Sequence, residues 1–224
     1  MVGQIIQWPA ELLRVASHSY HPQSFSRQGQ RDLSNQVQIK TTGDQVWSLQ
    51  MTLALDGDPD RVRMFDSYVD QMNGMANIAE FGVKDCLAYD ERIAPRMVPF
   101  STGEFFKGNR GFLGEGVQPL LASAIASGGD KSVTVTSEGG TLVPFRVGDL
   151  FSHNYFLYRV TGQSGGVVSF LPALRGDVAV DDVLATTPPT VRMRFASDEE
   201  GRATRTASAH RASVTLNFIE AFDR

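Results

Sequence analysis

The stretch that decides the fold is Gln45–Leu55, which reads QVWSLQMTLAL. Every second residue from Trp47 to Leu55 is large and apolar, and most residues between them are polar. This period of two is typical of a strand with one buried face and one face in water. We therefore predict a half-buried strand here.

Upstream of this strand, Val37 and Ile39 also alternate with polar residues. Thr42-Gly43-Asp44 lies between the two runs and has the composition of a hairpin turn. The sequence predicts an antiparallel pair joined at this turn.

A helix is expected directly downstream. Asp58-Pro59-Asp60 combines an N-cap residue, a proline suited to the first helical position and an acid at the positive end of the helix dipole. Apolar residues follow at three- and four-residue spacing up to Met72, and Gly74 supplies a stop. We predict one amphipathic helix of about four turns.

The second half of the chain consists of short β-rich runs between glycine turns, which predicts a small barrel-like unit. A polar connection then leads to a last alternating strand at 213–218, which needs a sheet already built as its partner. We predict a mainly β chain in two domains. Residues 1–100 and 208–224 form a discontinuous first domain, and residues 101–207 form an inserted barrel with flanking linkers.

Composition excludes several classes of protein. The 21 basic and 25 acidic residues give a net charge of -4, which argues against nucleic-acid binding. Cys86 is the only cysteine, so neither an intrachain disulfide nor a cysteine-clustered zinc site is possible. The first residues lack the pattern of a secretory signal, and no stretch has the ~20 apolar residues that span a bilayer. We expect no membrane insertion.

No pattern of catalytic or ligand-binding residues emerges. The four histidines fall in no metal-ligand spacing, so we expect all of them in surface or loop positions: His18, His21, His153 and His210. Cys86 is expected to be a small buried apolar residue. The chain has no nucleophile elbow, and its glycine-rich segment from Gly103 to Gly116 does not fit a phosphate-binding loop.

Two acid pairs, Asp181-Asp182 and Glu199-Glu200, are compatible with glycosidase carboxylates but are expected to be solvated turns. We predict that the chain is not an enzyme and has no catalytic, cofactor-binding or metal-binding residues. The 17 arginines against 4 lysines fit arginine-rich interfaces and biased genomic composition equally well. Candidate contacts with a partner or a glycan are the aromatic residues Phe105, Phe106, Phe112, Tyr155, Phe156 and Tyr158.

Several short motifs, and their order along the chain, resemble those of distal tail proteins. These proteins form the hub or adapter rings of long-tailed phages and phage-like gene transfer agents. The first-domain motifs are Ser24-Phe25-Ser26, the strand from Gly43 to Leu53, Met72-Asn73-Gly74 and the strand from Val214 to Phe222. The inserted-domain motifs are Val147–Phe151, Leu157–Val160, Pro172-Ala173-Leu174 and Pro188–Met193.

The resemblance implies a β-sandwich ring domain with one helix and an inserted barrel like an oligonucleotide/oligosaccharide-binding fold. It also implies a virion protein whose six copies form a ring at the distal end of the tail. The ring would join the tail tube to the hub, baseplate and receptor-binding components, without a cofactor. An alternative is a tail-tip module that binds host-surface carbohydrate, and a third is a cell-wall hydrolase that uses the acid pairs.

Overall fold

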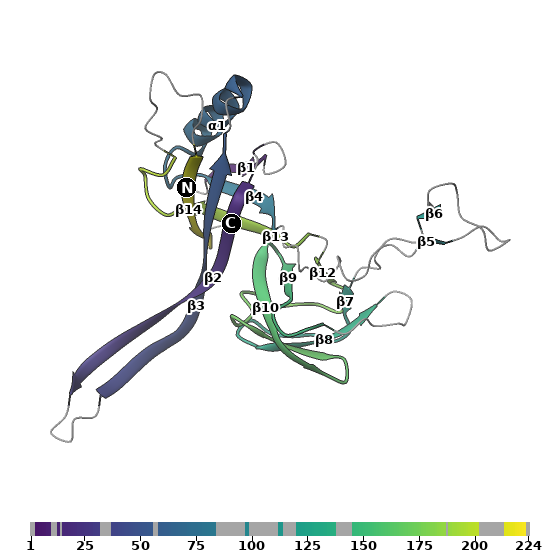
Figure 1. The fold of residues 1–224 in the computed structure, drawn as a ribbon. Coiled ribbons are helices and arrows are strands. Elements are labelled where there is room, and N and C mark those ends of the chain that lie inside the picture. Colours follow the sequence, from purple (N-terminus) through teal and green to yellow (C-terminus); the bar gives the residue numbers. More distant parts are fainter. Residues whose placement is uncertain are drawn as a thin grey trace. The chain divides into compact units, whose positions relative to one another are not determined.

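The computed structural model describes residues 3–9, 13, 15–31, 37–55, 58–83, 97–98, 112–113, 120–137, 145–186, 188–201 and 213–222. The chain divides into two compact units. Unit 1 comprises Met1–Gly82 and Thr190–Arg224, and unit 2 comprises Val83–Pro189. The described part is mainly β with one helix, which confirms the predicted fold class (Figure 1).

Unit 1 is built on one six-stranded sheet in the order β1-β4-β13-β14-β3-β2. β1 pairs with β4 in parallel, and the other neighbours are antiparallel. The strands are β1 (Ile5–Gln7), β4 (Ile78–Gly82), β13 (Thr190–Phe195), β14 (Ser213–Glu220), β3 (Val37–Ala54) and β2 (Val15–Arg31).

One face of this sheet forms the core of unit 1. The alternating residues of β3 are buried as predicted, and they face buried residues of β14, as in the pair Leu49 and Phe218. The indole of Trp8 contacts Phe218 of the sheet and Tyr68 of the helix edge-on, with ring centroids 5.6 and 5.9 Å apart. The described residues of unit 1 thus form one six-stranded sheet and one helix, which are joined by these ring contacts.

The helix α1 (Pro59–Met72) begins and ends as predicted. The Asp58 carboxylate accepts hydrogen bonds from the backbone N–H groups of Asp60 and Arg61 at 3.0 and 3.4 Å, so it acts as the N-cap. Phe65 and Met72 are buried along one side of the helix. Asn73 ends it in the left-handed conformation, at φ 48°.

Two details differ from the sequence analysis. Thr42, Gly43 and Asp44 lie within the continuous strand β3, where they form an irregularity, and not in a hairpin turn. Thr190–Phe195, expected in the barrel, pairs with β4 and β14, so the chain divides at residues 82 and 190 and not at 100 and 208. Alternation shows that a strand is half-buried but does not show which sheet it joins.

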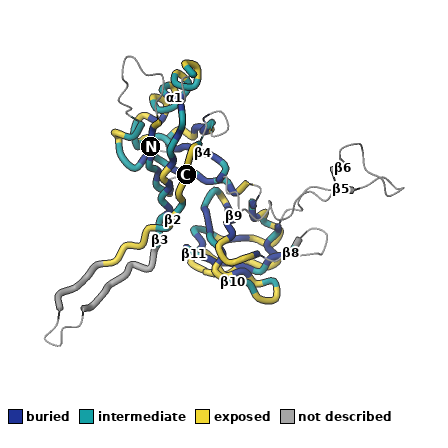
Figure 2. The backbone as a smooth tube through the Cα atoms, in the orientation of Figure 1, coloured by how far each residue is buried: buried dark blue, intermediate teal, exposed yellow. Residues whose placement is uncertain are grey.

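Unit 2 is a nearly closed barrel with strand order β12-β7-β8-β11-β10-β9. A backbone bridge between Ser152 and Ala185 links the two ends of this order. The strands are β7 (Leu120–Ala122), β8 (Ser132–Ser137), β9 (Leu150–His153), β10 (Phe156–Ser164), β11 (Val167–Leu171) and β12 (Val183–Leu184). A separate pair consists of β5 (Met97–Val98) and β6 (Phe112–Leu113). Figure 2 shows buried residues along the barrel strands, including Phe151, Tyr158 and Phe170.

Replacing Gly74 with alanine should destabilise unit 1. Gly74 has φ +64°, and a Cβ there would lie 2.5 Å from Oδ1 of Asp198, the atom that accepts a hydrogen bond from the Met75 N–H. We expect Gly74→Ala to lower the free energy of unfolding by about 1–3 kcal/mol, measured by chemical denaturation. Gly162→Ala is the control, because a Cβ at Gly162 meets nothing within 4 Å. An equal loss in both variants would contradict this explanation.

Candidate interaction surface

The described residues contain no group of three or more His, Cys, Asp or Glu side chains that could hold a metal ion. Within the same part of the chain, no helix is long and apolar enough to cross a membrane. The candidate sites of the described residues are therefore individual polar side chains and exposed surfaces.

One polar contact of unit 2 joins the buried His153 ring to Asp182. The His153 side chain is 6% exposed, and its Nε2 lies 3.2 Å from Oδ2 of Asp182. The same carboxylate oxygen accepts a hydrogen bond from the Ala179 N–H at 2.8 Å. The predicted surface position of His153 is wrong, because this ring lies inward at the end of β9, beside the bridge that brings the barrel ends together.

The other polar candidates are dispersed. His18 and His21 are exposed on β2, as predicted, whereas His210 and Cys86 lie outside the described residues. Asp181 and Glu199 are exposed. Glu200 has a structural contact, because its carboxylate accepts hydrogen bonds from the backbone and side-chain N–H groups of Asn217. The described acids of the two pairs thus lie in separate units.

Replacing Asp182 with alanine should destabilise unit 2. The change leaves the buried His153 ring and the Ala179 N–H without this acceptor, which costs about 1–3 kcal/mol of unfolding free energy. The unfolding free energy is measured by chemical denaturation, monitored with a spectroscopic probe placed in the barrel. The control is Asp181→Asn, which removes an exposed charge from the preceding residue. Asparagine, like aspartate, tolerates the positive φ of this position. This control should change stability by less than about 0.5 kcal/mol; similar losses in both variants would refute a role for the contact.

The predicted aromatic contacts do not form one surface. Phe105 and Phe106 lie outside the described residues, and Phe112 is described by its backbone in β6. Tyr155 is half-buried in a tight turn, and Phe156 packs against the barrel core. Tyr158 is 1% exposed and its hydroxyl accepts a hydrogen bond from the Arg175 N–H, so it belongs to the core and offers no surface to a glycan. The strand periodicity did not show which face of β10 points inward.

The most prominent exposed feature is a part of β2 and β3 that runs beyond the sheet. β14 pairs with β3 only from Ser48 to Ala54, whereas β2 continues to pair with β3 as far as Arg31 and Val37. We call residues 23–31 and 37–46 the arm. Figure 1 shows this hairpin extending past β13 and β14.

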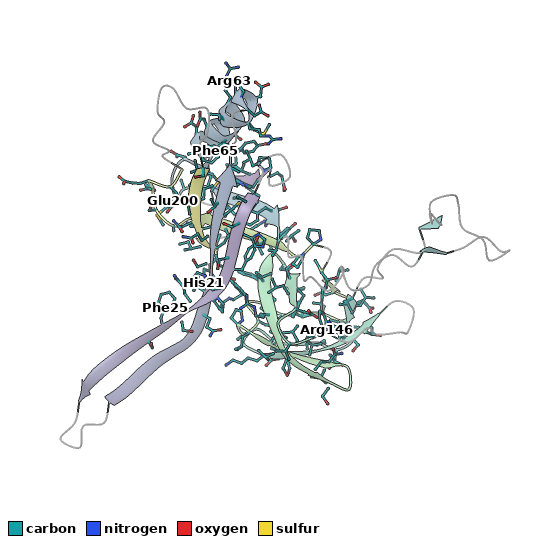
Figure 3. The ribbon with its side chains drawn as sticks, in the orientation of Figure 1. His21, Phe25, Arg63, Phe65, Arg146 and Glu200 are labelled. Atoms are coloured by element: carbon teal, nitrogen blue, oxygen red, sulfur yellow. The ribbon has the colours of Figure 1, made fainter. Side chains whose placement is uncertain are left out.

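The described side chains at the base of the arm are mostly exposed to solvent. Gln23, Ser24, Phe25 and Ser26 are all exposed at its base. The amide of Gln45 donates a hydrogen bond to the Ser24 hydroxyl across the two strands at 3.0 Å. Figure 3 shows Phe25 beyond His21 on β2, where the hairpin leaves the sheet. A two-stranded ribbon without a third strand or a core is marginally stable in water.

The arm is not predictable from the pattern of residues 15–31, because these residues do not alternate between apolar and polar side chains. The available signal was the pair Val37 and Ile39, which predicted a strand upstream of Gln45. That signal marks the second strand of the arm, and the first one has no comparable pattern.

The chain matches no protein-family model, and no curated protein matches its sequence.

Proposed function

We propose that this protein is a structural component that assembles with copies of itself, and that the arm makes contacts between copies. The observation that carries the proposal is the extension of β2 and β3 past the last residues that β14 covers. Ordering each residue of such a ribbon costs about 1–2 kcal/mol, and among the described strands no third strand packs beside it to offset that cost. A surface on a neighbouring molecule supplies the missing contacts.

The resemblance to distal tail proteins gives this assembly a specific form. The proposed product is a hexameric ring at the distal end of a phage-type tail. There it joins the tail tube to hub, baseplate and receptor-binding proteins. A closed ring of identical subunits requires head-to-tail contacts, in which one surface of a copy meets a different surface of the next. A projecting arm and the body that receives it are two such surfaces. In this role the protein needs neither a catalytic site nor a cofactor.

The test removes the outer arm and leaves its base closed. Ser26 and Thr41 are directly paired, so replacing Arg27–Lys40 with Asn-Gly joins them through a two-residue hairpin turn. Among described strands, the removed strand segments pair only with each other, so unit 1 should retain its melting temperature. We expect the full chain to form closed rings at high concentration and the variant to remain monomeric.

Mass photometry or native mass spectrometry measures the oligomeric state, and electron microscopy class averages show whether the oligomers are closed. A full-length protein that stays monomeric at high concentration would count against self-assembly. Rings formed equally well by the shortened variant would show that the arm is not the contact.

A further inference from the structure

The base of β2 is an edge of the unit 1 sheet. In the strand order of the described residues, β2 is last and has β3 as its one neighbour. Most of its residues from Ala16 to Ser26 are exposed, as Figure 2 shows along the lower part of this strand. Such an edge presents backbone N–H and C=O groups to any strand that comes alongside it.

This edge lacks the charges that usually protect exposed strands. No Lys, Arg, Asp or Glu occurs from Val15 to Ser26, although 21% of the chain is charged. Lysine and other charged residues on edge strands normally prevent another chain from pairing with them. Their absence over this length indicates an edge that is meant to be covered.

Pro22 shows which backbone groups point outward. It pairs with Trp47, whose N–H donates to the Glu220 carboxylate on the β14 side of β3. Because opposed residues in an antiparallel pair turn their backbone groups either both inward or both outward, the Pro22 nitrogen points away from β3. The proline therefore costs no hydrogen bond within the sheet, and it leaves one gap in the outer row of donors.

The apolar face of the sheet continues onto this edge. Tyr20 and His18 lie opposite Leu49 and Met51, which are buried in the core. His18 itself is exposed, and its ring contacts that of Tyr20 edge-on with centroids 5.2 Å apart. A strand added at the edge would cover these two rings with its own alternate side chains.

Phe25 marks the outer end of the edge. It is 52% exposed and lies where the register shifts, because Ser24 pairs with Gln45 but Ser26 pairs with Thr41. Irregularities of this kind redirect side chains at sheet edges. A large aromatic side chain held outward on a strand is the type of residue that dominates binding energy at protein interfaces.

We propose that Val15–Ser26 accepts a strand from a second copy of this chain, with Phe25 as its anchor. The inference rests on the proposed self-assembly and adds a second contact between copies, at the base of the arm, to the one made by the arm itself. The strand that fits is β1, at the opposite edge of the same sheet, because residues 1–10 also contain no charged side chain. Joining the two edges head to tail brings no like charges together.

The backbone of β1 is suited to this pairing. The Gln4 carbonyl accepts from the Ile78 N–H, and the Trp8 N–H donates to Glu80, so these residues face β4. The alternate residues Ile5 and Gln7 turn their backbone groups to the other side, where the neighbour would lie. Ile5 is 40% exposed, and this apolar side chain would be covered in the assembly.

Hydrogen exchange on the unmodified protein tests the edge directly. Peptides covering Ile5–Gln7 and Val15–Ser24 should exchange at least about tenfold more slowly in the assembled protein than in dilute monomer. The exposed tight turn at Gly165-Gly166 of unit 2 is the internal reference and should not change. Rings that form without added protection at both edges would overturn the proposal.

Two pairs of variants test the side chains. Ser19→Lys places a charge on the edge, whereas Ser169→Lys places the same charge at an exposed position of β11, which has a neighbour on each side. Phe25→Ala removes the anchor, and Phe222→Ala removes an equally exposed phenylalanine, at 50%. We expect Ser19→Lys and Phe25→Ala to weaken association at least about tenfold, with the controls within about twofold of the parent.

These results separate the two proposals. If shortening the arm abolishes rings but Ser19→Lys and Phe25→Ala associate like their controls, the strand-addition site is wrong and self-assembly through the arm stands. If the unmodified chain forms no oligomer, both proposals are wrong. A melting temperature within about 3 °C of the parent shows that each variant is folded before its association is compared.

Discussion

The pairing of β3 with β14 on one side and β2 on the other is the interaction on which unit 1 depends. Where β3 lies between the two strands, its alternate side chains are buried, as Leu49 and Met51 are. The fully buried Trp47 is the first described core residue of β3, and it lies next to Ser48, where the pairing with β14 stops. Upstream of it β3 retains one neighbour, so the same continuous strand is core at one end and arm at the other. No loop separates the two parts, although the register of pairing with β2 shifts between them.

The insertion of unit 2 follows from the same sheet. The chain leaves unit 1 after β4 and returns at β13, and these strands are adjacent, with Gly82 paired to Thr190. The Val83 N–H donates a hydrogen bond to the Pro189 carbonyl at 2.7 Å, which continues the pairing into the connection. An inserted domain with its two ends together adds little strain to its host. Each unit therefore has its own core: aromatic residues around Trp8 in unit 1 and around Phe151 in unit 2.

Local sequence patterns predicted the features that depend on neighbouring residues, namely the buried face of a strand and the ends of the helix. The alternation from Trp47 to Leu55 reported a buried face, and the Asp58 cap and the left-handed residues after Met72 fixed the helix ends. Long-range pairing was not accessible in this way. Nothing near Gly43 indicates that the strand continues through it, because glycine is compatible with both a turn and an irregular strand. The burial of His153 likewise depends on Asp182, which reaches it only when the barrel closes.

An uncharged edge such as Val15–Ser26 of β2 carries a risk of indiscriminate pairing, and this segment contains features that limit it. Pro22 removes one outward donor, so a strand in the wrong register would have an unsatisfied carbonyl opposite it. The register shifts near Ser17 and Ser26 bend the strand and interrupt the regular row of backbone groups between them. A flat partner of arbitrary sequence can therefore form only a short run of hydrogen bonds. In the proposed assembly, specificity would come from the shape of the edge, because Val15–Ser26 contains no Lys, Arg, Asp or Glu to supply it.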